Sequence, residues 1–206
     1  MSPFPADPSS SALTSHPIWQ PQLFAATVIV VSAPDGFDIA PPIDPGALTA
    51  VGATAEDGFH ALIAAEGGPH RLWFPEGGQP IQAAILIPFD AHFSERVLSI
   101  QRFHRWLTGR SFGPWPRWQR FSRYQIHRFS LMLRAWDGAQ AGAPRQEIAS
   151  LLLNSEVGKL RSIDWKNRPE RRRLHRLLKA GQQMIDGGYL RLLRPEARSG
   201  RGRLIP

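Results

Sequence analysis

The spacing of the apolar residues in this 206-residue chain changes near residue 90, and this change constrains the fold. Before it, apolar residues gather in short runs bounded by Gly, Pro or Asp, a pattern that favours strands over helices. The runs are FAATVIVV (24–31), FHALIAA (59–65), HRLWF (70–74) and IQAAILIP (81–88). Glycine pairs between the runs supply turns. This half of the chain predicts a small, mostly antiparallel sheet.

From residue 90 onward the apolar residues recur every three or four positions, which is the spacing of one helix face. A first helix is predicted over 90–109, where Asp90 can cap the start and Gly109 can end the helix. Its inward face comprises Phe93, Val97, Ile100, Phe103, Trp106 and Leu107. A second helix is predicted over 119–140, with Ile126, Phe129, Leu133 and Trp136 facing inward.

Three further segments complete the helical half. A short helix is expected within 141–153, where Pro144 suits the first turn. Residues 154–168 are expected to be irregular. A basic helix then runs from Pro169 to about Asp186, and the glycine pair after it can end it. The whole predicts an α+β fold: a small antiparallel sheet with a packing helix, followed by an all-α helix-turn-helix-like unit.

These patterns divide the chain into four parts. Residues 1–20 are rich in Pro and Ser and are expected to form a flexible tail. Residues 21–110 are expected to form a small β-rich domain with one helix. Residues 111–194 are expected to form the helical helix-turn-helix-like domain, and residues 195–206 a basic tail.

The charges of the two halves have opposite signs. Residues 1–100 contain ten acidic side chains against Arg71 and Arg96, a formal charge of −8. From residue 101 onward, 23 Lys or Arg face seven acids, a formal charge of +16. Such a division predicts a polyanionic partner for the second half. The acidic half is open to several interpretations: a solvated β-domain, a docking surface for a second copy, a regulator protein or RNA polymerase, or a mask over the basic half.

The residues of the basic helix separate into two sides on a helical wheel. One side is apolar and holds Leu174, Leu177, Leu178, Gly181, Met184 and Ile185. The opposite side holds Arg172, His175, Arg176, Lys179 and Gln183. Long polar side chains on a seated helix can reach base edges and phosphates in a DNA major groove. A solvated amphipathic helix shows the same pattern, so the helix alone leaves both interpretations open.

The short helix before it adds donors, because Arg145, Gln146 and the first backbone amides can contact a phosphate. The candidate DNA-binding residues are Arg145, Gln146, Arg168, Arg171, Arg172, Arg173, His175, Arg176, Lys179 and Gln183. Bases are expected to be read by Arg172, Arg176 and Gln183. Phosphate is expected to be held by Lys179 and the tail residues Arg198, Arg201 and Arg203. The alternatives are an RNA-binding or ribosome-associated protein, or a basic protein-interaction module.

Several segments together resemble one protein family. They are RAWDGAQAGAPRQEIA (134–149), Trp165, the Arg-rich helix, GGYLRLL (187–193), HRLWF (70–74) and LIPFDAHFSERV (86–97). The combination is similar to domain-of-unknown-function family 2285. That family is represented by RovC-type activators of type VI secretion genes and FseA-type activators of integrative-element excision genes. The resemblance implies a bacterial DNA-binding transcriptional activator whose C-terminal helices read duplex DNA.

The sequence lacks the patterns of catalytic and cofactor sites. There is no cysteine, which excludes disulfides and thiolate sites, and the seven His residues show no metal-ligand spacing. His60 and His70 are interpreted as half-buried structural residues, Trp165 as a core anchor, and Asp137 and Glu147 as capping or ion-pairing residues. No enzyme activity and no cofactor are expected. No signal peptide or membrane-spanning run is visible, so a cytoplasmic protein without a membrane partner is expected.

Overall fold

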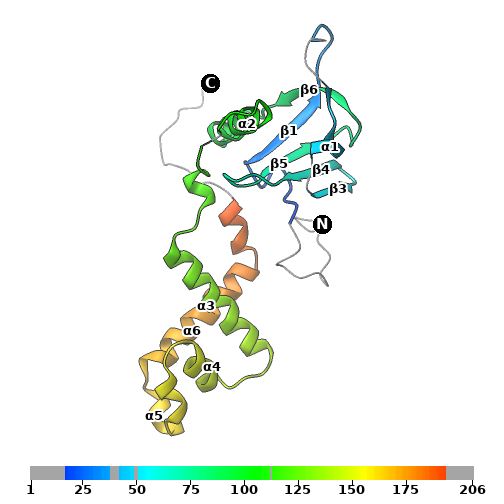
Figure 1. Ribbon diagram of the computed structural model, residues 1–206. Coiled ribbons are helices and arrows are strands. Elements are labelled where there is room, and N and C mark those ends of the chain that lie inside the picture. The colour runs from blue at the N-terminus through cyan, green and yellow to red at the C-terminus, as the bar shows by residue number, and fades with distance from the viewer. Residues whose placement is uncertain (1–16, 38–41, 49–50, 112, 194–206) are drawn as a thin grey trace, which may run out of the picture. The chain divides into compact units, whose positions relative to one another are not determined.

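The computed structural model describes residues 17–37, 42–48, 51–111 and 113–193 (Figure 1). The predicted tail over 1–20 lies outside the described residues as far as residue 16, and the predicted tail over 195–206 lies outside them entirely. The chain divides into two compact units. Residues 1–119 and 193–206 belong to the first unit, and residues 120–192 to the second.

The first unit contains a six-stranded sheet with the order β2-β6-β1-β5-β4-β3. Its strands are β1 Thr27–Ser32, β2 Pro42–Ile43, β3 Val51–Ala55, β4 Gly58–Ile63, β5 His70–Phe74 and β6 Ile81–Leu86. Neighbouring strands are antiparallel except β1 and β5, which are parallel. The α+β fold and the mostly antiparallel sheet are therefore confirmed. β2 and β3 were not among the predicted strands, because neither carries a run of large apolar residues.

The core of this unit follows the two-residue period of its strands. Val28 and Val30 of β1 and Leu72 and Phe74 of β5 are all at most 2% exposed and form one cluster with Phe103. Phe103 belongs to α2 (Phe93–Leu107), which packs against β1 (Figure 1). Burying side chains of this size contributes about 1.5–3 kcal/mol each. The alternation thus fixes the face of the sheet that α2 covers.

The ends of α2 differ in how well the sequence predicted them. Gly109 has a φ of +66°, and its amide bonds to the carbonyl of Trp106, so it ends the helix as expected. Asp90 does not cap the start, because the helix begins at Phe93 after His92. Asp90 instead pairs with Arg96, whose Nη2 lies 2.7 Å from Asp90 Oδ2. The hydrogen bond from Arg96 holds the pKa of Asp90 below its usual value.

Buried polar side chains of this unit serve its structure. Arg102 is 7% exposed and donates to the carbonyl oxygens of Gly113, Pro114 and Gly67 at 2.8–3.0 Å. His60 lies 2.9 Å from Asp57 Oδ1. Both His60 and His70 are buried, which supports their structural interpretation and places them deeper than expected.

The second unit is helical throughout. Its elements are α3 Arg123–Gln140, α4 Arg145–Leu152, η2 Ser155–Lys159, α5 Ser162–Lys166 and α6 Pro169–Ile185. η3 (Gly188–Leu193) follows α6, and the first unit holds the short elements α1 (Pro45–Leu48) and η1 (Arg117–Gln119). The expectation that 154–168 is irregular was wrong, since η2 and α5 occupy most of it. Asn154 accepts a hydrogen bond from the amide of Glu156 and starts η2.

α3 begins later than predicted, at a capping box. Ser122 accepts from the amide of Gln125, and Gln125 Oε1 accepts from the amide of Ser122. α3 ends in a Schellman motif, where the amide of Ala143 bonds to Gly138 O and that of Gly142 to Ala139 O. The turn into α4 is therefore tight.

The inward face of α3 also differs from the prediction. Ile126 and Leu133 are 56% and 58% exposed, whereas Leu131, Met132 and Ala135 are buried. α4 and α6 both contact α3, and their position, not the spacing of the largest side chains, selects the buried stripe (Figure 1). Ala135 is fully buried in the core cluster where the helices meet. A prediction based on large apolar side chains does not identify such a small residue as buried.

Candidate nucleic-acid interface

The basic helix α6 has clear start and stop signals. Pro169 occupies its first position, where the missing N–H costs nothing, and Arg168 precedes it with extended backbone angles. Gly187 follows the helix with a φ of +108°, a conformation that other residues rarely adopt. Both boundaries agree with those predicted.

The apolar side of α6 faces the rest of its unit. Leu174 is 1% exposed and joins a cluster with Trp165, while Leu177 packs with Met132 of α3. Gly181 is also buried on this side, and a Cβ at that position would lie 3.4 Å from Met132 O of α3, an ordinary van der Waals distance. This confirms the predicted seat, except that Ile185 at its end is 45% exposed.

The opposite side of α6 is exposed over its whole length. Its exposed members are Arg172, His175, Arg176, Lys179 and Gln183, and the flanking Arg171 and Arg173 are exposed as well. Within the described part of the chain, none of the five forms an ion pair or a hydrogen bond through its side chain. Arg172, Arg176, Lys179 and Gln183 stand at spacings of four, three and four, so they form one ridge. We name these four residues the α6 ridge.

The arginines around the start of α6 are more constrained. Arg168 Nε lies 3.3 Å from Glu170 Oε2, and Asn154 Nδ2 donates to Glu170 Oε1 over 3.1 Å. The pKa of Glu170 is lowered first by a hydrogen bond from its own backbone amide and then by the one from Asn154. Arg171 Nη1 donates to the carbonyl of Lys166 at 3.0 Å. Arg168 and Arg171 therefore already have partners within the unit.

The two candidates on α4 are separated by the structure. Arg145 is exposed at the first position of the helix. Gln146 points into the unit, where Nε2 donates to Val157 O at 2.7 Å and to Leu160 O at 2.8 Å. Its amide fixes η2 against α4, and a DNA contact by the same donors would have to break these bonds.

Other polar residues do not form the pairs expected of them. Within the described residues, Asp137 and Glu147 form no side-chain ion pair or hydrogen bond, and both are exposed. Helix termini here are closed by backbone and Asn or Ser groups instead. Trp165 is 8% exposed in the core cluster, as the core-anchor interpretation requires.

The net charge of the second unit favours a polyanion. Residues 120–192 contain 15 Lys or Arg against six Asp or Glu, a formal charge of +9. The sign change near residue 100 is not the border between the units, because α2 and the segment to residue 119 belong to the first unit. Within 101–119, the four arginines Arg102, Arg105, Arg110 and Arg117 are counted in the basic half but belong to the first unit.

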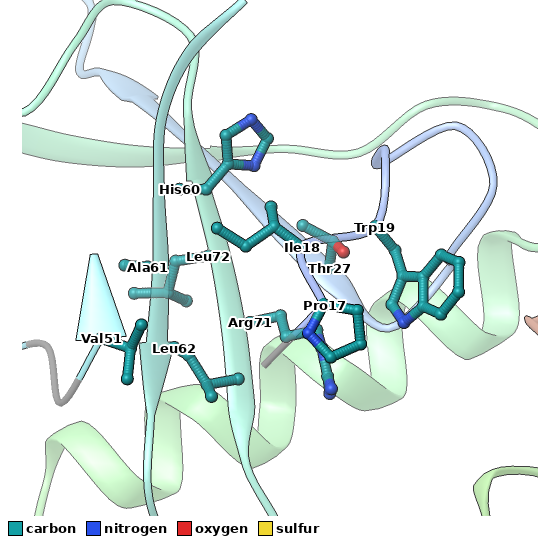
Figure 2. Close-up of a pocket in the computed structure, with 10 residues that line it drawn as sticks. All are labelled: Pro17, Ile18, Trp19, Thr27, Val51, His60, Ala61, Leu62, Arg71 and Leu72. Atoms are coloured by element: carbon teal, nitrogen blue, oxygen red, sulfur yellow. The ribbon is translucent and has the colours of Figure 1, made fainter. Parts of the chain in front are cut away.

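An open hollow of about 420 Å³ lies over α4 and η2, lined by Pro144, Gln146, Glu147, Ser150, Leu151, Gly158 and Leu160. Figure 2 shows a pocket where Pro17, Ile18 and Trp19 lie over the sheet beside Thr27 and Arg71. Its volume of about 20 Å³ holds little more than one water molecule. Arg71 there lies over the ring of Phe24 at 5.2 Å, and burial lowers its pKa.

The described residues also contain no group of three or more His, Asp or Glu that could hold a metal ion. Nor do they include a helix of the length and apolar character needed to cross a membrane.

Comparison with known proteins gives two family matches. Residues 86–194 match the RovC DNA-binding domain family, described as a T6SS transcription factor, DNA binding domain. Residues 26–85 match a domain of unknown function, DUF7012. No curated protein and no solved structure matches the chain.

Proposed function

The chain belongs to the RovC DNA-binding domain family of type VI secretion system (T6SS) transcription factors, and from this membership we propose that it activates transcription by reading duplex DNA with α6. The family makes the protein a DNA-binding transcription factor linked to type VI secretion and points away from an enzyme.

One observation carries the assignment of α6 as the reading helix: a ridge of exposed cationic and amide side chains without partners in the described chain. The major groove of DNA is wide enough to admit an α-helix. The base edges in that groove present a distinct pattern of donors and acceptors for each base pair. The α6 ridge extends over twelve residues, from Arg172 to Gln183, or about 16 Å of helix, which matches about five base pairs. No Asp or Glu lies between Arg172 and Gln183. A helix that only faces solvent usually carries both acidic and basic side chains over such a length.

The roles within the α6 ridge follow from its chemistry. An arginine fork can bond both acceptors of a guanine edge, so Arg172 and Arg176 are the base-reading residues, with Gln183 suited to adenine. Lys179 acts as a point charge on phosphate. Arg173 and Arg145 supply further phosphate contacts, whereas Arg168, Arg171 and Gln146 first hold their own unit together.

Activation is assigned over repression because the sequence resembles RovC-type activators. The protein partner is then RNA polymerase or a second regulator protein. The protein acts in the cytoplasm, where the bacterial chromosome lies. In transcription from a type VI secretion promoter, the purified protein should raise the amount of transcript, and a fall would reverse the sign of the assignment.

The test of α6 begins with selection of bound sequences from random duplex DNA. Affinity for the selected site, a scrambled site and duplex RNA is then measured with the wild-type chain and single alanine variants. Arg176→Ala should lose about 1–3 kcal/mol on the selected site and little on the scrambled one. Lys179→Ala should weaken both alike and lower the slope of log affinity against log salt by about 0.9.

Arg134→Ala provides the matched control, because Arg134 is an exposed arginine on α3 that lies outside the α6 ridge. It removes the same charge and should leave discrimination unchanged. Unchanged affinity in Arg172→Ala, Arg176→Ala and Lys179→Ala, with the fold intact, would remove α6 from the interface. Tighter binding to duplex RNA than to any DNA would favour the RNA-binding alternative.

A further inference from the structure

The exposed face of α3 carries hydrogen-bond donors at the same spacing as the α6 ridge. Intervals of four, three and four residues separate Arg123, His127, Ser130 and Arg134. All four side chains are exposed, and within the described residues none of them forms an ion pair or a hydrogen bond. Like the α6 ridge, the set extends over twelve residues, or about 16 Å of helix. We name these four residues the α3 row.

The sequence around the α3 row offers no acidic side chain to neutralise it. No Asp or Glu occurs between Glu95 and Asp137, whereas nine arginines do. Asp137 stands three residues after Arg134, yet it forms no ion pair within the described residues. Helix faces that only meet water usually carry charges of both signs. The α3 row therefore has the character of a surface for an anion.

The α3 row and the α6 ridge point away from each other. α3 and α6 pack together, with Gly181 of α6 against Met132 of α3 (Figure 1). On helical wheels, every member of the α3 row lies about 140–180° from Met132, and every member of the α6 ridge lies about 140–180° from Gly181. The distance between two packed helix axes plus one helix diameter places the two exposed faces about 20 Å apart. A straight duplex on the α6 ridge therefore does not reach the α3 row.

The rest of the chain is not acidic enough to be the partner of the α3 row. The first unit contains ten arginines against eleven Asp or Glu, a formal charge of −1, whereas the second unit carries +9. The neutralising polyanion must therefore come from outside the chain. DNA is the polyanion on which this family acts. Guanidinium, imidazole and hydroxyl groups can all donate to its phosphate oxygens.

We propose that the α3 row binds the phosphates of a second segment of duplex DNA, so that the helical unit lies between two duplexes. This inference rests on the proposed function, because α6 holds the first duplex. Phosphate contacts carry no sequence information, so the second segment can have any sequence. The chain then brings another stretch of DNA to the site that α6 reads.

Capture of one duplex by another tests the α3 row. A duplex with the selected α6 site is tethered to beads and loaded with the full chain, and the affinity of this complex for a fluorescent duplex of scrambled sequence is measured. The wild type should capture the second duplex. Arg123→Ala combined with Arg134→Ala should lower that affinity roughly tenfold and its slope against log salt by about 1.8, since two phosphate contacts are lost. Binding to the tethered site should stay unchanged, because the α6 ridge is intact.

Two further double variants serve as controls. Arg128→Ala combined with Arg191→Ala removes the same charge from exposed arginines of the second unit that lie outside the α3 row and the α6 ridge. This variant should capture the second duplex like the wild type. Arg123→Lys combined with Arg134→Lys should also retain capture, since an ammonium group holds phosphate as a point charge. Circular dichroism and sedimentation check that fold and mass are the same in every variant.

Each contrary result has a distinct meaning. A wild-type complex that binds the tethered site but captures no second duplex would overturn the inference and leave the role of α6 intact. Equal capture by the wild type and the Arg123→Ala, Arg134→Ala variant would contradict it as well. If that variant, still folded, lost the tethered site, the α3 row would belong to the first duplex and the inference would be wrong. Failure of the α6 assignment is seen separately, as unchanged binding of the tethered site in Arg176→Ala and Lys179→Ala.

Discussion

The side chain of Gln146 and the main chain of Val157 are joined directly, with Nε2 of the amide 2.7 Å from the carbonyl oxygen. The same nitrogen donates to Leu160 O, so one amide binds two carbonyls of the segment between α4 and α5. Val157 itself is fully buried between the helices. The position of the segment before α6 therefore depends on a residue that the sequence suggested as a DNA contact.

Replacement of Gln146 should reveal which of these roles matters. Gln146→Ala removes the donors to Val157 O and Leu160 O, and of these two carbonyls Val157 O keeps its bond from the amide of Leu160. The free energy of unfolding should fall by about 1–2 kcal/mol. Affinity for selected and scrambled DNA should fall by the same factor, as measured by urea unfolding and fluorescence anisotropy. A variant of unaltered stability that loses discrimination would instead restore Gln146 to the base-reading set.

The turn between β3 and β4 depends on a glycine. Gly58 has a φ of +124°, and a Cβ there would lie 2.3 Å from Phe74 O. Gly58→Ala should destabilise the first unit by about 2–4 kcal/mol, because backbone strain adds to a clash with main chain. Gly36→Ala is the comparison, with a φ of +89° but nothing within 4 Å. Its cost should stay near 1 kcal/mol in thermal unfolding, and equal costs would argue against the close contact.

The first unit should lose stability in mild acid because of His70. Burial, followed by the charge of Arg102, lowers the pKa of His70 to about 4. The unfolded chain binds its proton near pH 6.5, so the His70 contribution is complete above that pH and disappears as the pH falls to about 4. The loss over this window should be about 3 kcal/mol. His70→Phe, which keeps an aromatic ring beside Phe103, should show a flatter profile in urea unfolding at pH 7 and 4.5.

A cut after residue 119 should separate the DNA-binding unit from the first unit, whereas a cut at residue 100 would divide α2. Residue 100 lies inside α2, which belongs to the first unit. A fragment beginning at residue 120 should bind duplex DNA, and residues 1–119 should not. Binding is measured by anisotropy after each fragment is shown to be folded by circular dichroism. DNA binding by residues 1–119 alone would contradict the assignment.

The sequence predicted those parts of the structure that local signals determine. The limits of α6 follow from Pro169 and Gly187, and its buried side follows from the spacing of Leu174 and Leu177. The inward face of α3 was predicted only in part: Phe129 and Trp136 are half-buried, whereas tertiary contacts with α4 and α6 bury Ala135 and leave Leu133 exposed. The parallel pairing of β1 with β5 depends on contacts between distant residues, which spacing along one strand cannot encode.

The site was predicted with the same limits. The exposed ridge of α6 was visible as a pattern of charges on one helix face. The hydrogen bonds of Gln146 to η2 were not predicted, because η2 itself was not predicted. Its start signal, Asn154 followed by Ser and Glu, is present in the sequence but lies in a region interpreted as irregular.

The place of β1 in its sheet also has a consequence for biosynthesis. Among the strands of the described residues β1 leaves the ribosome first, yet its partners in β5 and β6 lie more than 40 residues further along the chain. Until they emerge, the uncharged segment FAATVIVV has no partner within its own chain. Loop closure over this length slows folding, and an unpaired segment of this composition is prone to aggregate during the delay. The yield of native protein should therefore depend on the speed of translation through β5 and β6.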